Sequence, residues 1–430
     1  MADERDIPEE LLNFFKDEYG KSVVIKGTPG TGKTIFALTL LSILHGKGIY
    51  LSTRVDPEML YETCPWIRGE ISKENVLDAT QSERPAARRR VTTIKPLKYT
   101  DVPEFLREVY ERTENMKNPI VIIDSWDAVA THTGYYEPRD REKLEHNLCD
   151  FARKTGTKMI FIVEYTEQKP LDYLVDGVVI TENIVSDDRI LRKMFIQKLR
   201  GCEIRNPFSL FTLKGGKFKT FKFESLREKL RSLREAVPAE TLEDLSERRI
   251  STGVAALDEV LGGYGHLNVF TGDFLAFRML SQVAALNALN LGRSVIVAEE
   301  RAEMIEEILP FVSAANRDKV KVVREPRKII EEMDENALLL MDIADIGMKI
   351  GDFASILRAK RCFALCYASH RTDTEAEKVA SAENVASVVL QTSQFAGVPC
   401  VCGETPRTGF FALEWDVSAG FPAVKATPIE

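Results

Sequence analysis

The sequence is poor in the residues that build metal sites and disulfide frameworks. It has five histidines in 430 residues, and none of them has the spacing of a metal-ligating motif. Its seven cysteines are an odd number spread over a long chain, which indicates reduced thiols in a reducing compartment. The pairs Cys362/Cys366 and Cys400/Cys402 fall at even spacing in apolar runs and lack the two-residue gap of most structural zinc sites. We therefore expect these thiols to pack as small buried hydrophobes.

Long hydrophobic runs and a basic, apolar leader are also missing. No stretch of about 18 apolar residues occurs, and the first 15 residues carry five acids. We expect neither secretion nor membrane insertion, and a cytoplasmic protein. The net charge of -8 argues against a dedicated nucleic-acid coat protein but permits a local basic patch.

The length of 430 residues predicts two or three domains. Residues 222–249 are the strongest boundary, because seven basic and seven acidic residues occupy half of the 28 positions. Leu226, Leu230 and Leu233 recur at helical spacing there, so Glu224 to Glu235 is expected to form a short amphipathic helix. That helix either lies on a neighbouring domain or is solvated. The expected layout is a first domain over residues 1–222, a charged linker over 223–249 and a second domain over 250–430.

The first half alternates short apolar runs with longer helical stretches. The helical stretches expected here are residues 35–45, 102–114 and 141–154. An antiparallel pair of strands is expected to follow at residues 194–198 and 208–212, joined to a further segment at 218–223. The expected buried strands are residues 21–26, 48–53, 119–124, 158–164 and 177–181. This order predicts an α/β fold with a mainly parallel sheet and helices on both faces.

The second half repeats the first. Residues 266–272, 294–300 and 337–342 correspond to strands at 22–27, 49–55 and 119–124, with offsets of about 245 that shorten to 218 at the last strand. A repeat of this size indicates two tandem copies of one domain, since solenoid units run about 20 to 50 residues.

One segment carries a complete phosphate-binding motif. It follows an expected strand and precedes an expected helix, the context that the G-x-x-x-x-G-K-[ST] pattern requires. Backbone N–H groups and the helix N-terminus would surround phosphate oxygens, Lys33 would reach the β and γ phosphates, and Thr34 would offer a hydroxyl to Mg²⁺. The predicted ATP-binding residues of this loop are Gly27, Thr28, Pro29, Gly30, Thr31, Gly32, Lys33 and Thr34.

A second element of the same site is the apolar strand Ile120 to Asp124. It ends in a carboxylate about 90 residues after the loop, which is the pattern of a Walker B strand. We therefore predict that Asp124 and Thr34 hold the Mg²⁺ of a bound Mg·ATP.

These motifs, in their order, resemble the RecA-like ATPases of the KaiC group. The resemblance extends over essentially the whole chain, through the KLRG sequence at residues 198–201, the PFSLF sequence at 207–211 and the entry-like segment Ser251 to Gly263. A narrower similarity, based on an arginine cluster after the P-loop domain, is to the archaeal gas-vesicle regulatory D proteins. The resemblance implies two tandem RecA-like domains, nucleotide-dependent assembly into a homo-oligomer and a regulatory output through protein partners.

The first domain departs from the KaiC pattern at the position of the general base. The group carries a Glu-Glu pair after the second strand, where this chain has Arg54 and Val55. Arginine does not accept a proton, so the usual base is missing and slow turnover is expected. Glu164, at the end of the strand 159–163, is the candidate substitute; the alternative is a solvated carboxylate at a strand end. Arg54 itself is a candidate contact to phosphate or to a neighbouring subunit.

The second domain shows the reverse losses. It keeps Glu299, Glu300 and Asp342, but residues 272–279 replace the phosphate loop. Phe277 occupies the position of the motif's second glycine, Arg278 that of its lysine and Met279 that of its hydroxyl residue. We expect a degenerate copy that does not bind ATP in the usual way.

Lys198 and Arg200 match the K-x-R element of the family. Residues two apart on a strand point to the same face, so the two cations can converge on one phosphate group. The resemblance implies that they reach the nucleotide of the next subunit and take part in catalysis with Lys33; the alternative is an exposed basic pair.

The segment Arg84 to Lys98 holds six basic residues and no acids. It suits a solvated or interdomain role, a protein partner or, less well, nucleic acid, because it has little aromatic interleaving.

Our sequence-based hypothesis is a slowly hydrolysing Mg·ATP-binding regulatory ATPase. A DNA-dependent recombination ATPase and a nucleotide-stabilised scaffold without turnover are the alternatives.

Overall fold

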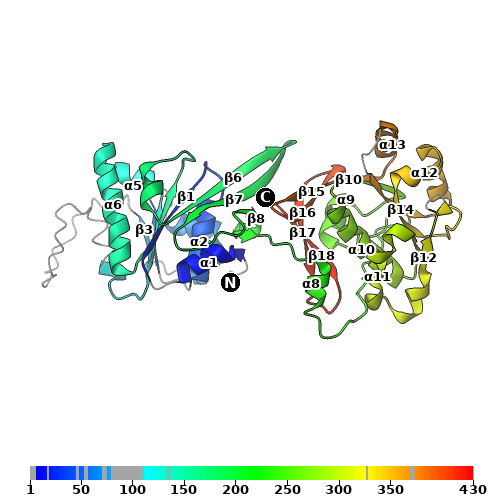
Figure 1. Ribbon diagram of the computed structural model, residues 1–430, viewed down its shortest axis with the longest axis horizontal. Coiled ribbons are helices and arrows are strands. Elements are labelled where there is room, and N and C mark those ends of the chain that lie inside the picture. The colour runs from blue at the N-terminus through cyan, green and yellow to red at the C-terminus, as the bar shows by residue number, and fades with distance from the viewer. Residues whose placement is uncertain are drawn as a thin grey trace. The chain divides into compact units, whose positions relative to one another are not determined.

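The computed structural model describes residues 6–16, 19–44, 48–52, 57–69, 75–78, 109, 111–132, 135, 137–325, 328–368 and 373–429. Arg54, Val55, the basic segment 84–98 and most of the helix expected at 102–114 lie outside the described residues. The chain divides into two compact units, the first made of residues 1–186 and 191–220 and the second of residues 187–190 and 221–429 (Figure 1).

In the described residues, the first unit contains a nine-stranded sheet in the order β3-β2-β4-β5-β1-β6-β7-β8-β9. Strands β1 to β5 pair in parallel, β6 joins β1 in parallel, and β7, β8 and β9 pair antiparallel. The strands are β1 (Lys21–Lys26), β2 (Gly48–Ser52), β3 (Val76–Asp78), β4 (Ile120–Asp124), β5 (Lys158–Val163), β6 (Gly177–Ser186), β7 (Arg189–Leu199), β8 (Phe208–Thr212) and β9 (Lys219–Thr220). The expected α/β fold class is confirmed.

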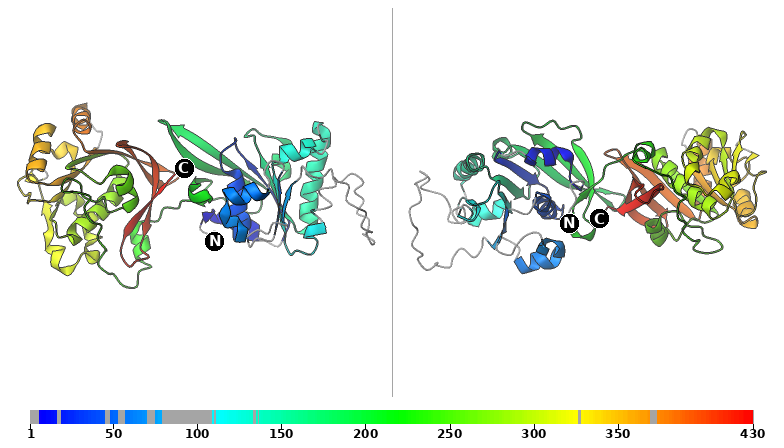
Figure 2. Two further views of the ribbon diagram at one scale, coloured as in Figure 1. Left: turned by 180° about the vertical axis from the view of Figure 1, so that it is seen from behind. Right: turned by 90° about the horizontal axis from the view of Figure 1, so that it is seen from below.

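Helices cover both faces of this sheet because its central strands are apolar on both sides. In β1, Val23 and Ile25 face one hydrophobic cluster and Val24 faces the other. The first cluster packs against α1 (Glu9–Lys16), α2 (Lys33–Ile43) and α3 (Pro57–Thr63). The second packs against α5 (Trp126–His132), α6 (Pro138–Thr155) and α7 (Pro170–Leu174). Figure 2 shows α6 on the side of the sheet opposite to α1 and α2.

The second unit repeats this topology strand for strand. Its order, β12-β11-β13-β14-β10-β15-β16-β17-β18, becomes that of the first unit when each strand is replaced by its counterpart. The strands are β10 (Leu267–Gly272), β11 (Val295–Ala298), β12 (Val320–Val323), β13 (Leu338–Asp342), β14 (Phe363–Ala368), β15 (Val388–Phe395), β16 (Val398–Thr405), β17 (Arg407–Asp416) and β18 (Ala423–Pro428). Two tandem RecA-like domains account for both sheets.

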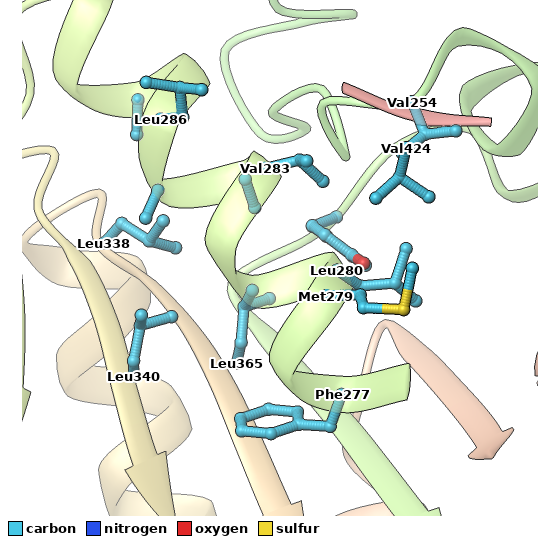
Figure 3. Packing of buried hydrophobic residues seen from close by; sticks show 14 of the residues in the cluster. Val254, Phe277, Met279, Leu280, Val283, Leu286, Leu338, Leu340, Leu365 and Val424 are labelled. Carbon is cyan, nitrogen blue, oxygen red and sulfur yellow. The ribbon is translucent and has the colours of Figure 1, made fainter. Parts of the chain in front are cut away.

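Two hydrophobic clusters also sandwich the second sheet. One packs against α9 (Ala255–Leu261), α10 (Phe274–Asn290) and α11 (Ala302–Glu306), and the other against α12 (Ile350–Ala359) and α13 (Asp373–Glu383). Helix α10 is almost entirely buried, and Figure 3 shows it packing against Leu338 and Leu340 in the middle of the sheet and against Val424 near its edge. None of the helices in the described ranges is long and apolar enough to cross a membrane.

The charged segment 223–249 packs on the second unit along its length. Its helix α8 (Leu226–Leu230) is shorter than expected and begins at Ser225, whose side chain and that of Glu228 form a capping box. Leu226 is buried in the core cluster, and Leu230 and Leu233 pack against it. Further along, the Leu242 backbone bonds to Asn287 on α10. The apolar stripe therefore anchors this segment to the second unit, although half of its residues are charged.

Truncation of Leu226 tests this anchoring. Leu226→Ala removes buried methyl groups, so we expect the free energy of unfolding of the second unit to fall by about 2–3 kcal/mol. Calorimetry of the full chain would measure the loss. Leu245→Ala, at a leucine that is 45% exposed, is the matched control. Equal effects of the two substitutions would contradict an anchoring role for Leu226.

Candidate functional site

The phosphate motif forms an open loop between the end of β1 and the start of α2. Gly30 and Gly32 have φ values of 80° and 84°, a region that favours glycine. A Cβ added to Gly30 would project into open space, whereas one on Gly32 would come within 2.8 Å of the Leu213 side chain. One side of the loop is thus free for a ligand, and the other is closed by packing.

Lys33, the first residue of α2, is folded into this loop. Its side chain is buried, and its Nζ donates hydrogen bonds of 2.8 Å to the carbonyl oxygens of Gly27 and Thr28. The ammonium group therefore already lies within the turn where the motif predicts phosphate.

Asp124 faces the loop from the end of β4. Its Oδ2 accepts a hydrogen bond of 2.6 Å from Thr34 Oγ1 and one of 2.7 Å from the hydroxyl of Tyr50. Burial raises the pKa of Asp124, although the two hydroxyl donors and the charge of Lys33 act in the opposite direction. A carboxylate and a hydroxyl are hard oxygen ligands of the kind that Mg²⁺ prefers, so the predicted metal-binding residues are brought together in a fitting arrangement.

Glu164 lies at the same edge of the sheet. It directly follows β5, which pairs with β4, and its negative charge helps to raise the pKa of Asp124. The structure therefore brings Glu164 into electrostatic range of the loop and the Walker B carboxylate.

Lys198 and Arg200 lie at the opposite end of the sheet. Lys198 Nζ donates to the carbonyl oxygens of Asp172 and Val175, and Arg200 bonds to the Tyr173 carbonyl and to Asp176. Asp176 in turn bonds to Ser22, near the start of β1, whereas the phosphate loop follows the end of β1. Roughly 13 Å of strand separates Ser22 from Lys26, so this pair does not meet the phosphate loop of its own chain.

Sequence reasoning missed several residues that contact the loop from distant strands. Arg192 on β7 donates to the Gly30 carbonyl at 3.1 Å and to Asn183 on β6, and its Nε is buried without a hydrogen-bond partner. Thr181 on β6 donates to Thr31 Oγ1 at 2.9 Å. These residues are about 150 positions from the loop, and no local pattern marks them, because their placement depends on strand register.

Comparison with known proteins agrees with this geometry. The model of the family described as GvpD gas vesicle protein, P-loop domain, matches residues 11–200, which span the phosphate loop, Asp124, Glu164 and the Lys198/Arg200 pair. Residues 11–200 are therefore similar to the GvpD P-loop domain.

Relatives that align with 61–69% of this chain fall into two groups. Protein GvpD2 of Halobacterium salinarum is 30% identical over 312 residues, which cover 68% of this chain and 61% of that protein. Protein GvpD1 of the same organism is 29% identical over 61% of this chain and 49% of the relative. The circadian clock oscillator protein KaiC of Rippkaea orientalis is 25% identical over 69% of this chain and 54% of the relative. These alignments span about half to three fifths of each relative's length, and they confirm the resemblance to the KaiC group and the gas-vesicle D proteins.

The second unit differs from the GvpD P-loop domain at the corresponding place. After β10, helix α10 begins at Phe274 with only Asp273 between them, and the Asp273 side chain caps the helix by accepting from the Leu275 N–H. Phe277 is fully buried, with its ring 5.2 Å from that of Tyr367. A capped helix and packed rings therefore stand where the first unit has an open loop.

A buried arginine also lies at the place that corresponds to the phosphate loop and its metal site in the first unit. Arg301, in the 3₁₀ turn Glu299–Arg301 after β11, is 8% exposed and lies 5.5–5.8 Å from the ring centres of Phe274, Phe277 and Tyr367. Its guanidinium bonds at 3.1 Å to Asp342, the counterpart of Asp124. Cation–π contacts and an ion pair thus stabilise an internal cation beside the Walker B position.

Arg278, which stands for the P-loop lysine, points elsewhere. It forms an ion pair of 2.7 Å with Glu307, which also accepts from Gln282 and from Arg227 on α8. Burial alone would raise the pKa of Glu307, but these three donors lower it overall. Arg278 therefore helps to fasten the charged segment 223–249 to its own unit.

The two cysteine pairs lie in strands and beside them, as buried thiols. Cys362, Cys366, Cys400 and Cys402 are all buried, and burial raises the pKa of Cys402 to about 11. Within the described part of the chain, no group of three or more His, Cys, Asp or Glu side chains is arranged to hold a metal ion.

Removal of the internal cation should destabilise the second unit. Arg301→Ala leaves Asp342 without its guanidinium and opens a gap among three rings, so we expect a loss of about 3 kcal/mol in the free energy of unfolding. The measurement is thermal unfolding of the full chain. Arg324→Ala, at an arginine whose side chain is 87% exposed, is the control and should change stability by less than about 0.5 kcal/mol.

Proposed function

We propose that the first unit binds Mg·ATP and works as a slow regulatory ATPase. The observation that carries this proposal is the joint geometry of the loop: an open glycine turn, Lys33 folded into it, and Thr34 bonded to Asp124. Lys33 and the loop N–H groups would hold the phosphates, and Thr34 and Asp124 would hold the metal. A bound Mg²⁺ supplies charge that stabilises the phosphates during transfer.

Hydrolysis requires a group that orients or activates water. Arg54 and Val55 replace the acidic pair of the KaiC group, so we assign this role to Glu164, which directly follows the strand next to that of Asp124. One carboxylate in place of a pair supports slow turnover, closer to a switch than to a motor.

We further propose that the protein acts as a homo-oligomer in which Lys198 and Arg200 serve the nucleotide of the next subunit. Their distance from the phosphate loop of their own chain supports a contact in trans. Both cations are occupied by carbonyl oxygens in the isolated chain, so assembly would exchange these bonds for phosphate contacts. The output is proposed to pass through a regulatory protein partner, for which the basic segment 84–98 is a candidate surface.

The second unit is proposed to be a degenerate copy that binds no nucleotide in this manner. The packed rings of Phe277 and Tyr367 and the Arg301–Asp342 pair support this assignment, because they occupy the position of the phosphate loop and its metal. Its role would be structural or regulatory.

The nucleotide site is tested by Lys33→Ala. We expect ATP affinity to fall about 100-fold or more, because a charged donor to phosphate is lost. Lys143→Ala, at an exposed lysine on α6, should leave affinity unchanged. Equilibrium binding of a fluorescent ATP analogue measures both. A tight Mg·ATP complex in Lys33→Ala would disprove the site assignment.

The trans contact is tested by mixing variants. Lys33→Ala and the double variant Lys198→Ala/Arg200→Ala should each lose turnover, the latter by about 10³-fold. A mixture should recover turnover, because some interfaces then combine an intact loop with an intact cation pair. The mass of each sample with and without Mg·ATP reports assembly, and assembled mixtures without recovery would contradict the trans role.

The same turnover assay separates the alternatives. Stimulation by single-stranded DNA that weakens with salt would favour a DNA-dependent ATPase. Retention of unhydrolysed ATP after purification, without turnover, would favour a nucleotide-stabilised scaffold.

A further inference from the structure

Tyr50 is a polar residue in a position that the sheet would fill with an apolar one. It lies in the middle of β2, whose five residues are all buried, and its own side chain is fully inaccessible to solvent. Tyr50 pairs in register with Ile122 on β4, two residues before Asp124. A buried hydroxyl without a partner costs free energy, so its hydrogen bond determines whether a tyrosine is tolerated here.

The partner of this hydroxyl is the Walker B carboxylate. Tyr50 and Thr34 donate to the same atom, Asp124 Oδ2, at 2.7 and 2.6 Å. Hydrogen bonds to a carboxylate are short and about twice as strong as neutral ones. A carboxylate can only accept, so the tyrosine hydroxyl is the donor in this bond.

The two donors, Thr34 and Tyr50, have different expected roles when Mg·ATP binds. Thr34 belongs to the phosphate loop and is itself a proposed metal ligand, so its hydroxyl oxygen would be shared between Mg²⁺ and its hydrogen bond to Asp124. Tyr50 belongs to the sheet and has no other proposed task. Its hydrogen bond can therefore hold the carboxylate in place independently of the phosphate loop.

We propose that Tyr50 is a positioning residue that fixes Asp124 in the orientation needed to receive Mg²⁺. This inference rests on the proposed function, because it assigns a role within the same metal–nucleotide site. Partners that orient a metal-binding carboxylate typically change metal affinity by 10- to 100-fold when they are removed. Tyr50 thus sets the Mg²⁺ requirement of nucleotide binding rather than the affinity for the nucleotide itself.

The test is a magnesium titration of Tyr50→Phe, which keeps the ring and removes only the hydroxyl. Binding of a fluorescent ATP analogue to the full chain is followed as Mg²⁺ is added. We expect the Mg²⁺ concentration at half-saturation to rise about tenfold, while affinity for the metal-free analogue changes less than about twofold. Tyr61→Phe, at another buried tyrosine of the same hydrophobic cluster, should leave the Mg²⁺ midpoint unchanged.

A double-variant cycle separates positioning from a general packing effect. In the Asp124→Asn background, Tyr50→Phe should produce no further shift of the Mg²⁺ midpoint, because the carboxylate through which it acts is gone. Full additivity of the two substitutions would overturn the proposal, as would an unshifted midpoint in Tyr50→Phe alone. If the unmodified chain binds no nucleotide at any Mg²⁺ concentration, the proposed function fails instead of this inference.

Discussion

The parallel alignment of β1, β4 and β5 is the constraint on which the rest of the first unit depends. Lys26 pairs with Val163, and Asp124 pairs with Ile162, so three strands end within about one residue of each other. Whatever follows these strands therefore gathers at one edge of the sheet. The phosphate loop, the Walker B carboxylate and Glu164 come from three distant parts of the sequence, and this register alone brings them together.

The second unit keeps the register and replaces the chemistry at its edge. Asp342 pairs with Tyr367 as Asp124 pairs with Ile162, and the strand orders of the two sheets match throughout. At the edge, however, Tyr367 stands where the first unit has Ile162, and the Arg301 guanidinium contacts both the aromatic rings and the Asp342 carboxylate. The two units thus share the arrangement of the sheet and differ in the residues at the ends of its strands.

Sequence patterns predict the elements that local physics determines. The apolar strands, the duplicated order and the loop from Gly27 to Thr34 are contiguous signals, and the fold class follows from them. Tyr50 and Arg192 were not predictable, because a strand residue becomes part of the site only through its cross-strand neighbours and through its distance to a loop far away in the chain. The sequence shows that Arg278 replaces the loop lysine. The ion pair of Arg278 with Glu307 and the link from Glu307 to α8 could not be predicted, because they depend on tertiary packing.

The buried guanidinium of Arg301 supplies the second unit with a positive charge that does not depend on a bound ligand. A nucleotide or a metal ion binds reversibly, so the occupied fraction of its site depends on its concentration. Chelation, dilution or consumption of the ligand empties the site. Arg301 is covalently part of the chain, and an arginine keeps its charge at every physiological pH. The core of the second unit consequently carries its own permanent counter-ion for Asp342, and the charge of this carboxylate is balanced without a metal ion.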